Sequence, residues 1–390
     1  MSPRWMRTHE FVEPRSPLNM ECRTSASRSL RVINICLVAV VGIFLSSLDA
    51  TAASSGPGLP PSSYALGQGW FFPQYDLRLG GYTDIKYYQI DHGKRALSVE
   101  DASLFVTKDW GSRWRFFTET ELTDALNSEG NGVTMTDARI DVERLYLDYR
   151  LFDSATLRFG KFLTPIGQWN LTHADPLVWT SVRPLTTESS FASHANGAMI
   201  YGTLNVDSND LDYWLFVDDS AAIGIDTTND AAFGAYGATN KLKNSFAHAV
   251  GGQLLYHMWN GHLSIGGSAA TFTMELPNIS YSLLGLDIDW SDRFGDVSGE
   301  AIRRTSHSPG YPDDYGGYLQ GVLNLPSRFF LVGRIERYKS AAVTGRITLR
   351  TVGVNYRPSA GVVVKVERVD GTNSRTVSPS GWFASFGLLF

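Results

Sequence analysis

The chain has 390 residues, with 34 basic and 39 acidic side chains and a formal net charge of −5 at pH 7. This mild acidic excess argues against a protein that binds nucleic acid. Aromatic residues make up 12% of the chain and 37 glycines recur along it, while no stretch reads as a long amphipathic helix. The pattern predicts an all-β chain of many short strands joined by regular turns.

Residues 1–52 are predicted to form a secretory signal peptide. Basic residues precede an apolar run over 32–48, and the small residues 50–52 provide an A-x-A cleavage site. The alternative is an uncleaved anchor, but the run is short for a membrane span. Both cysteines of the chain lie in this segment, so the remainder has no disulfide chemistry.

Residues 53–74 are rich in Pro, Gly and Ser and are predicted to be a flexible periplasmic leader. Residues 75–390 follow one rhythm of alternating segments and turns, which predicts a transmembrane β-barrel. A period of two places alternate residues on opposite faces of a strand. In one segment the apolar and the polar set are Trp114, Phe116 and Leu122 against Arg115, Glu119 and Glu121.

About 16 antiparallel strands are expected, with 14 or 18 as the alternatives. The predicted segments are 75–89, 98–108, 113–122, 139–151, 155–162, 197–205, 211–218, 247–259, 262–273, 281–290, 294–304, 315–324, 329–339, 346–356, 362–369 and 382–390.

The connections between these segments alternate between tight turns and longer loops, which is the organisation of an outer-membrane barrel whose two ends lie on the short-turn side. Aromatic residues such as Trp110, Trp259 and Phe294 flank the tight turns. They are interpreted as one interfacial girdle, although aromatic residues are also common in strands generally. The last segment, which ends in Phe390, resembles the signature that such barrels present to their assembly machinery.

Charged residues on the polar phase of the strands are predicted to line a water-filled channel. Facing lipid they would cost about 2–4 kcal/mol each near the midplane, whereas facing the channel they stay hydrated and set ion preference. The alternative is that they form salt-bridged ladders that only shape the wall. The predicted pore-lining residues are Arg78, Lys86, Arg115, Glu119, Glu121, Arg144, Asp148, Arg150, Arg158, Asp287, Arg334, Glu336 and Lys365.

Segment 163–196 is too long and too apolar for an idle surface loop, and its prolines interrupt any helix or long strand. Folding inward would hide its apolar side chains against the barrel wall and narrow the channel. The alternative is packing at a subunit contact or over the rim. The polar residues expected at this constriction are Gln168, His173, Asp175 and Arg183.

No catalytic motif of the H-E-x-x-H, G-x-S-x-G or phosphate-loop type is present, so no enzyme, cofactor or metal is predicted. Two other readings stay open: a plugged structural or adhesive barrel, and a barrel that hydrolyses lipids.

Residues 157–167 (LRFGKFLTPIG) resemble the strand-into-loop segment of bacterial outer-membrane porins, particularly the phosphate-selective porin O and P group, and residues 176–179 (PLVW) are similar too. The resemblance implies a 16-stranded, homotrimeric diffusion channel for small hydrophilic solutes or ions. It places the chain in the outer membrane of a Gram-negative bacterium, in contact with lipid and lipopolysaccharide. Phosphate selectivity in that group rests on stacked Arg and Lys residues. The lumen predicted here is mixed in sign, so phosphate selectivity is not carried over.

Overall fold

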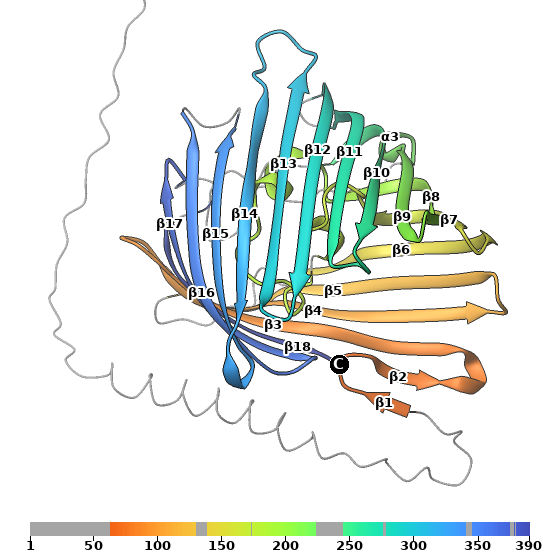
Figure 1. Cartoon of the computed structure of the whole chain (residues 1–390), viewed down its shortest axis with the longest axis horizontal. Coiled ribbons are helices and arrows are strands. Elements are labelled where there is room, and N and C mark those ends of the chain that lie inside the picture. Colours follow the sequence, from red (N-terminus) through yellow and green to blue (C-terminus); the bar gives the residue numbers. More distant parts are fainter. Residues whose placement is uncertain are drawn as a thin grey trace, which may run out of the picture. The chain divides into compact units, whose positions relative to one another are not determined.

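The computed structural model describes residues 63–129, 139–172, 174–223, 245–275, 278–340, 345–374, 378 and 380–390. Sixteen strands, β3 to β18, each pair antiparallel with the next strand along the chain. The last of them, β18, pairs with β3 over Gly381–Leu389 and Tyr82–Ile90, which closes the sheet into a barrel (Figure 1). The closed antiparallel barrel predicted from the sequence is therefore confirmed.

The bounds of the barrel strands follow the predicted segments one for one. They are β3 (Leu77–Ile90), β4 (Arg95–Trp110), β5 (Trp114–Glu129), β6 (Arg139–Phe152), β7 (Ala155–Leu163), β8 (His194–Val206), β9 (Asn209–Asp218), β10 (Phe246–Met258), β11 (Leu263–Met274), β12 (Ile279–Asp292), β13 (Gly295–Ser306), β14 (Asp314–Asn324), β15 (Phe329–Lys339), β16 (Ile347–Ser359), β17 (Val362–Thr372) and β18 (Gly381–Leu389).

The helices of the described residues are short. Two α-helices, α2 (Leu185–Ser190) and α3 (Ser220–Ile223), and three 3-10 turns, η1 (Pro73–Tyr75), η2 (Asn170–Thr172) and η4 (Pro326–Arg328), lie between strands. Within these residues no helix is both long and apolar enough to cross a membrane.

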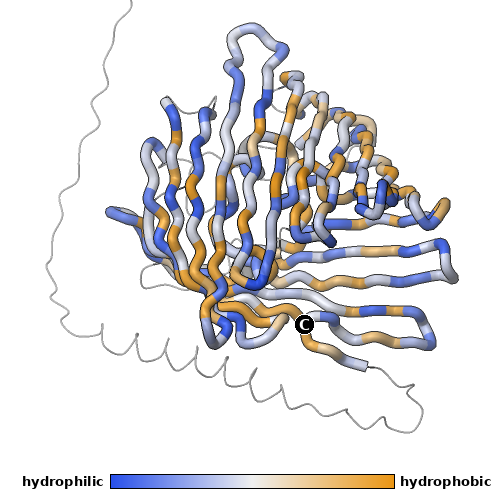
Figure 2. The backbone as a smooth tube through the Cα atoms, viewed as in Figure 1, coloured by the Kyte–Doolittle hydropathy of each residue, from blue (hydrophilic) through white to orange (hydrophobic). Residues whose placement is uncertain are grey.

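The two faces of the barrel differ as period-two alternation requires. On β12, Leu284 and Leu286 point outward and Leu286 is 69% exposed, whereas Asp287 points inward and is buried. Hydrophobic and hydrophilic residues alternate in the same way along most strands (Figure 2). The outer face therefore offers apolar side chains to lipid and the inner face holds the polar groups.

Part of the predicted leader is paired with the barrel. Two short strands, β1 (Ser63–Ala65) and β2 (Gly69–Phe72), pair with each other, and β2 pairs with β3 at Leu77–Leu79. The physical reason is an open edge: β18 pairs with β3 only from Tyr82 onward, so the first residues of β3 have no partner from β18. Strand β2 pairs with these residues instead, because the unpaired backbone N–H and C=O groups of a strand edge readily form hydrogen bonds with another strand.

Two β-bulges each add a glutamate to the wall. Glu100 lies between Val99 and Asp101, which pair with consecutive residues of β3. Glu143 is skipped in the same way between β5 and β6. A bulge shifts the alternation by one residue, which explains why Val142 and Leu145, three residues apart, both face outward.

The tight turn between β8 and β9 has the backbone that a two-residue hairpin needs. Asp207 and Ser208, between β8 and β9, both have positive φ values of 47° and 72°. That conformation matches the right-handed twist of the flanking strands and favours Asn, Asp and Gly.

A charge on the outer face should destabilise the barrel according to its depth. We expect Val352→Arg, in the middle of β16 and 59% exposed, to lower the free energy of unfolding by about 2–4 kcal/mol. The measurement is denaturant unfolding in phospholipid vesicles. The control is Thr348→Arg, on the same face near the end of β16, for which a loss of about 0–1 kcal/mol is expected. Equal losses at the two positions would contradict the assignment of the lipid-facing side.

Candidate pore and constriction

The charged residues predicted to line the pore share the inner face of the barrel. Strand register places them side by side: Arg115 lies opposite Asp148, Asp148 opposite Arg158, and Glu119 opposite Arg144. On the other side of the barrel the inner row runs from Asp287 across Glu300 and Tyr318 to Glu336. Alternation thus assigned the phase of these strands correctly, but it did not say which charges meet water.

The segment between β7 and β8, residues 164–193, lies against the inner face of β11 to β18. Three glutamates of that wall accept hydrogen bonds from its backbone. Glu300 accepts from the N–H groups of Gln168 and Trp169, both at 2.8 Å. Glu367 accepts from Ser181 (3.1 Å) and Val182 (3.0 Å).

Glu336 accepts from the N–H of Leu185 at 2.9 Å. Hydrogen bonds to a carboxylate are among the stronger ones that proteins make. Five of the segment's backbone donors are therefore satisfied by side chains of the barrel wall.

Basic side chains of the same wall bind the carbonyl oxygens of the segment. Arg334 donates to the Val182 carbonyl at 2.6 Å, and Arg357 donates to the Pro176 carbonyl at 2.9 Å. Lys365, which is fully buried, donates to the Asp175 carbonyl at 2.6 Å and forms an ion pair with its carboxylate at 3.1 Å. The wall therefore satisfies both the donors and the acceptors of a segment that has little secondary structure of its own.

Apolar side chains of the segment complete the contact. Ile166 and Phe191 are each 1% exposed and pack with Phe216 and Phe272 on the inner face. In a second cluster, Val182 and Leu185 pack with Tyr338, Leu349 and Phe383. These side chains would be exposed on an idle loop, and their burial stabilises each large one by about 1.5–3 kcal/mol.

Several residues expected to face the channel water lie instead beneath this segment. Asp287, Arg334, Glu336 and Lys365 are on the inner face but buried, because they bind the segment or lie under it. Glu300, which sequence reasoning did not single out, is buried in the same way. The sequence pattern alone carried no signal to separate these charges from the others on the inner face.

The residues expected at the constriction also divide into buried residues that bind the wall and a partly exposed one. Gln168 donates to Asp287 at 3.2 Å, and Asp175 is 6% exposed and bonded to Lys365 and Ser385. Arg183 is 36% exposed and lies 3.7 Å from Glu188. His173 lies outside the described residues.

Asp175 stays ionised in this buried position. Burial opposes its ionisation, but the ammonium groups of Lys365 and Lys86 outweigh that effect and hold the pKa of the Asp175 carboxyl below its ordinary value. The link between this segment and the wall is therefore retained at neutral and mildly acidic pH, since stability from a lowered carboxyl pKa is lost only as the pH falls through that value.

Of the anchors described above, the inner face of β3 to β8 carries Lys86 of β3, whose ammonium lies 3.6 Å from the Asp175 carboxylate. Arg78, Arg115 and Arg150 are exposed there. The backbone N–H of Arg150 donates to the Arg113 carbonyl at 2.8 Å, and among the described residues its guanidinium has no hydrogen-bond or ion-pair partner. Arg115 forms an ion pair with Asp109 at 2.7 Å, and Arg158 forms a bidentate pair with Asp148 at 2.7 and 2.9 Å.

Acidic residues gather farther along the same wall. Carboxylate oxygens of Asp84, Glu100 and Asp101 lie within 4.8 Å of one another, a spacing that a metal ion could bridge. However, the ammonium of Lys86 lies 3.2 Å from Asp84 and also forms an ion pair with Glu100. Lys86 therefore supplies the positive charge that this cluster needs, and no metal site is inferred from it.

Comparisons with known proteins agree with this geometry. The sequence model of the family described as Phosphate-selective porin O and P matches residues 74–239. No curated protein sequence matches the chain.

Solved structures with the same fold include an anion-selective porin from Comamonas acidovorans (15% identity, TM-score 0.53), which covers 80% of this chain and 98% of its own. OmpT of Vibrio cholerae in a trimer form has 9% identity and a TM-score of 0.53, covering 80% and 99%. The outer membrane channel DcaP of Acinetobacter baumannii has 10% identity and a TM-score of 0.53, covering 83% and 100%.

The anchoring of segment 164–193 can be tested through Glu367. We expect Glu367→Gln to speed chymotrypsin cleavage after Trp179 in the folded protein by about tenfold or more, because a lost hydrogen bond to a charged group costs about 1.5–3 kcal/mol and cleavage follows the population of opened segment. The measurement is the rate of appearance of the cleavage product on a gel.

The matched control is Asp370→Asn, which removes a carboxylate from the exposed outer face of the same strand. Its cleavage rate should equal that of the unaltered protein. An unchanged rate in Glu367→Gln would show that this glutamate does not hold the segment in place.

Proposed function

We infer that the chain, an outer-membrane porin that resembles the phosphate-selective porin O and P group, lets small hydrophilic solutes and ions cross the outer membrane by passive diffusion through a water-filled channel. We further propose the course of that channel: between segment 164–193 and the inner face of β3 to β8. The observation that supports this course is the side from which the segment's backbone is bound. Glu300, Glu336 and Glu367 bind it from the wall of β11 to β18, whereas β3 contributes the Lys86–Asp175 ion pair at 3.6 Å.

The proposed narrowest part lies where Arg183 faces acidic residues of β4 and β6. The charges that act most strongly on Arg183 include, after Glu188, Asp101 on β4 and Glu143 on β6. Cationic and anionic groups on opposite sides of a narrow channel exclude apolar solutes and favour hydrated polar ones. Farther toward the short turns, the exposed arginines Arg78, Arg115 and Arg150 would line the path.

Single-channel recording in a planar bilayer with a salt gradient tests this course. Discrete ohmic steps are expected, and replacing Arg78, Arg115 and Arg150 together by Gln should lower the anion-to-cation permeability ratio roughly twofold or more, since lumen charge concentrates ions of opposite sign. The control replaces Arg303 and Arg350, which are exposed on the outer face. Folded protein that gives no steps would favour a plugged structural barrel instead.

We propose that the porin is a homotrimer. The support is its likeness to OmpT of Vibrio cholerae, which is described in a trimer form. Light scattering of the detergent-solubilised protein should give three times the mass of the chain, and heating should convert an unheated gel band of the trimer to the monomer. A monomeric mass before heating would contradict this assembly.

We also propose that cations at the loop end of the outer face contact lipopolysaccharide and lipid headgroups. Arg303, Arg337, Lys339, Arg350 and Arg368 lie on the outer phase near that end of β13, β15, β16 and β17. Phosphates are the groups that such side chains bind. Replacing Arg337 and Lys339 by Gln should reduce the lipopolysaccharide that copurifies with the protein, and an unchanged amount would contradict the contact.

A further inference from the structure

The inner face of β3 to β6 carries a row of aromatic rings on the phase that otherwise holds charges. The aromatic row is Tyr82, Phe105, Phe117 and Tyr146, one residue from each of four neighbouring strands. Ring centroids lie 5.8 Å apart between Tyr82 and Phe105, 5.8 Å between Phe105 and Phe117, and 5.0 Å between Phe117 and Tyr146. Phenyl rings on the water-facing wall of a channel do not touch lipid, so contact with lipid does not explain their presence there.

Two arginines pack against the aromatic row. Arg144 lies 4.8 Å from the Phe117 ring and binds Glu119 through Nε. Arg158 lies 3.6 Å from the Tyr146 ring and is paired with Asp148 through two hydrogen bonds. Arg144 also lies 5.7 Å from the Phe105 ring. These contacts fix the rings in place by cation–π attraction, and a further arginine, Arg78, lies beside Phe105 and Phe117 in the middle of the row.

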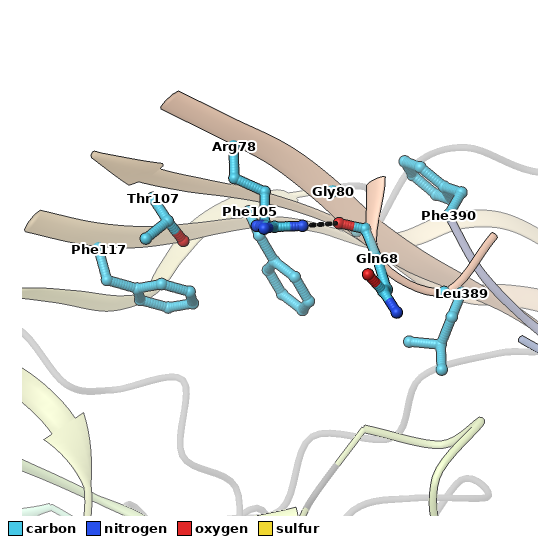
Figure 3. A pocket seen from close by; sticks show the side chains of 10 residues that line it. Gln68, Arg78, Gly80, Phe105, Thr107, Phe117, Leu389 and Phe390 are labelled. Carbon is cyan, nitrogen blue, oxygen red and sulfur yellow. Dashed lines mark hydrogen bonds between the residues drawn. The ribbon is translucent and has the colours of Figure 1, made fainter. Parts of the chain in front are cut away.

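A pocket of about 290 Å³ opens beside Phe105 and Phe117. Figure 3 shows Phe105, Phe117, Thr107 and Arg78 on one side of it, with Gln68, Leu389 and Phe390 on the other. None of its ten lining side chains is acidic. Its size is at the lower end of the range of about 300–1,000 Å³ that small-molecule sites occupy.

Arg78 is the cation of this pocket, and much of its binding capacity is unused. It donates one hydrogen bond from Nη1 to the Gln68 carbonyl at 3.2 Å, and its guanidinium lies 5.2 Å from the Phe71 ring. It forms no ion pair with any carboxylate of the described residues. A guanidinium has five N–H donors in a planar fork, so donors remain for an anion.

We propose that this pocket binds small aromatic carboxylates, of the size of benzoate, as they pass through the lumen. The inference rests on the proposed function and names a solute class for it. Arg78 would bind the carboxylate through two parallel hydrogen bonds, and the rings of Phe105 and Phe117 would contact the flat apolar body in offset or edge-on geometry. Inorganic phosphate fits less well, because placing a fully hydrated anion against phenyl rings removes its water without replacing those hydrogen bonds.

The experiment is single-channel recording in KCl with benzoate added on the side of the short turns. Benzoate should reduce the open-channel current at concentrations where acetate, inorganic phosphate and the uncharged benzyl alcohol do not. Acetate has the carboxylate without the ring, and benzyl alcohol has the ring without the charge. Only a site that binds both the carboxylate and the ring would give a block with benzoate and none with the other three probes.

Two variants locate the site. Arg78→Gln should weaken the benzoate block about tenfold, as loss of a charge-assisted hydrogen-bond pair predicts, and Phe117→Leu should weaken it roughly threefold through loss of a ring contact. The matched controls are Arg350→Gln, which removes the same charge from the exposed outer face, and Phe159→Leu, also on the outer face. Both controls should keep the block of the unaltered protein, and folding of each variant is verified by heat-dependent gel mobility.

The outcomes are distinguishable. Ohmic steps in KCl without a benzoate-specific block, or a block that both Arg78→Gln and Phe117→Leu leave unchanged, would overturn the pocket and leave the porin intact. Folded protein without steps in KCl would overturn the diffusion channel itself. If Arg78→Gln does not fold, Phe117→Leu against Phe159→Leu decides the question alone.

Discussion

The requirement that every backbone N–H and C=O inside a bilayer find a partner within the protein determines this structure. An open sheet leaves two edges unpaired, so the sheet must close, and closure here is the pairing of β18 with β3. The recruitment of β2 to the first residues of β3 follows from the same requirement, since β18 ends before it reaches them. Closure in turn creates an inner face, where charges can stay hydrated at the depth of the hydrocarbon core.

The charged side chains of the inner face have two different roles. On β11 to β18, charged side chains form hydrogen bonds with the backbone of segment 164–193. They are Glu300, Glu336, Glu367, Arg334 and Lys365. A segment interrupted by three prolines forms, within its described residues, only the short helical pieces η2 and α2, so the rest of its backbone depends on side chains of the wall. Around β3 to β8 the arginines remain exposed or are paired with neighbours on the same wall.

The sequence was sufficient for the barrel, because a period of two is a local signal that survives in each strand independently. Each of the sixteen predicted segments corresponds to one strand, and the polar phase assigned to Arg115, Glu119 and Glu121 is the inner face. The bulges at Glu100 and Glu143 could not be seen, because an extra residue in one strand is defined only by the register of its partner. The pairing of β2 was missed for a similar reason, since Gly, Pro and Ser around it suggest flexibility unless the open edge of β3 is known.

The division between structural and solute-facing charges could not be predicted, because it depends on which wall segment 164–193 contacts. Asp287 and Arg115 look alike in sequence, each a charge that alternates with apolar residues, yet one is buried and the other is half exposed. A sum of lumen charges from sequence therefore misstates the field that a solute meets.

Phe117 shows where a finer reading was possible, since it has the parity of Arg115 and Glu119 and so must face inward. A ring on the polar phase points to a solute contact only where segment 164–193 does not cover the wall, because Phe216, Phe272 and Phe383 share that phase and pack against the segment.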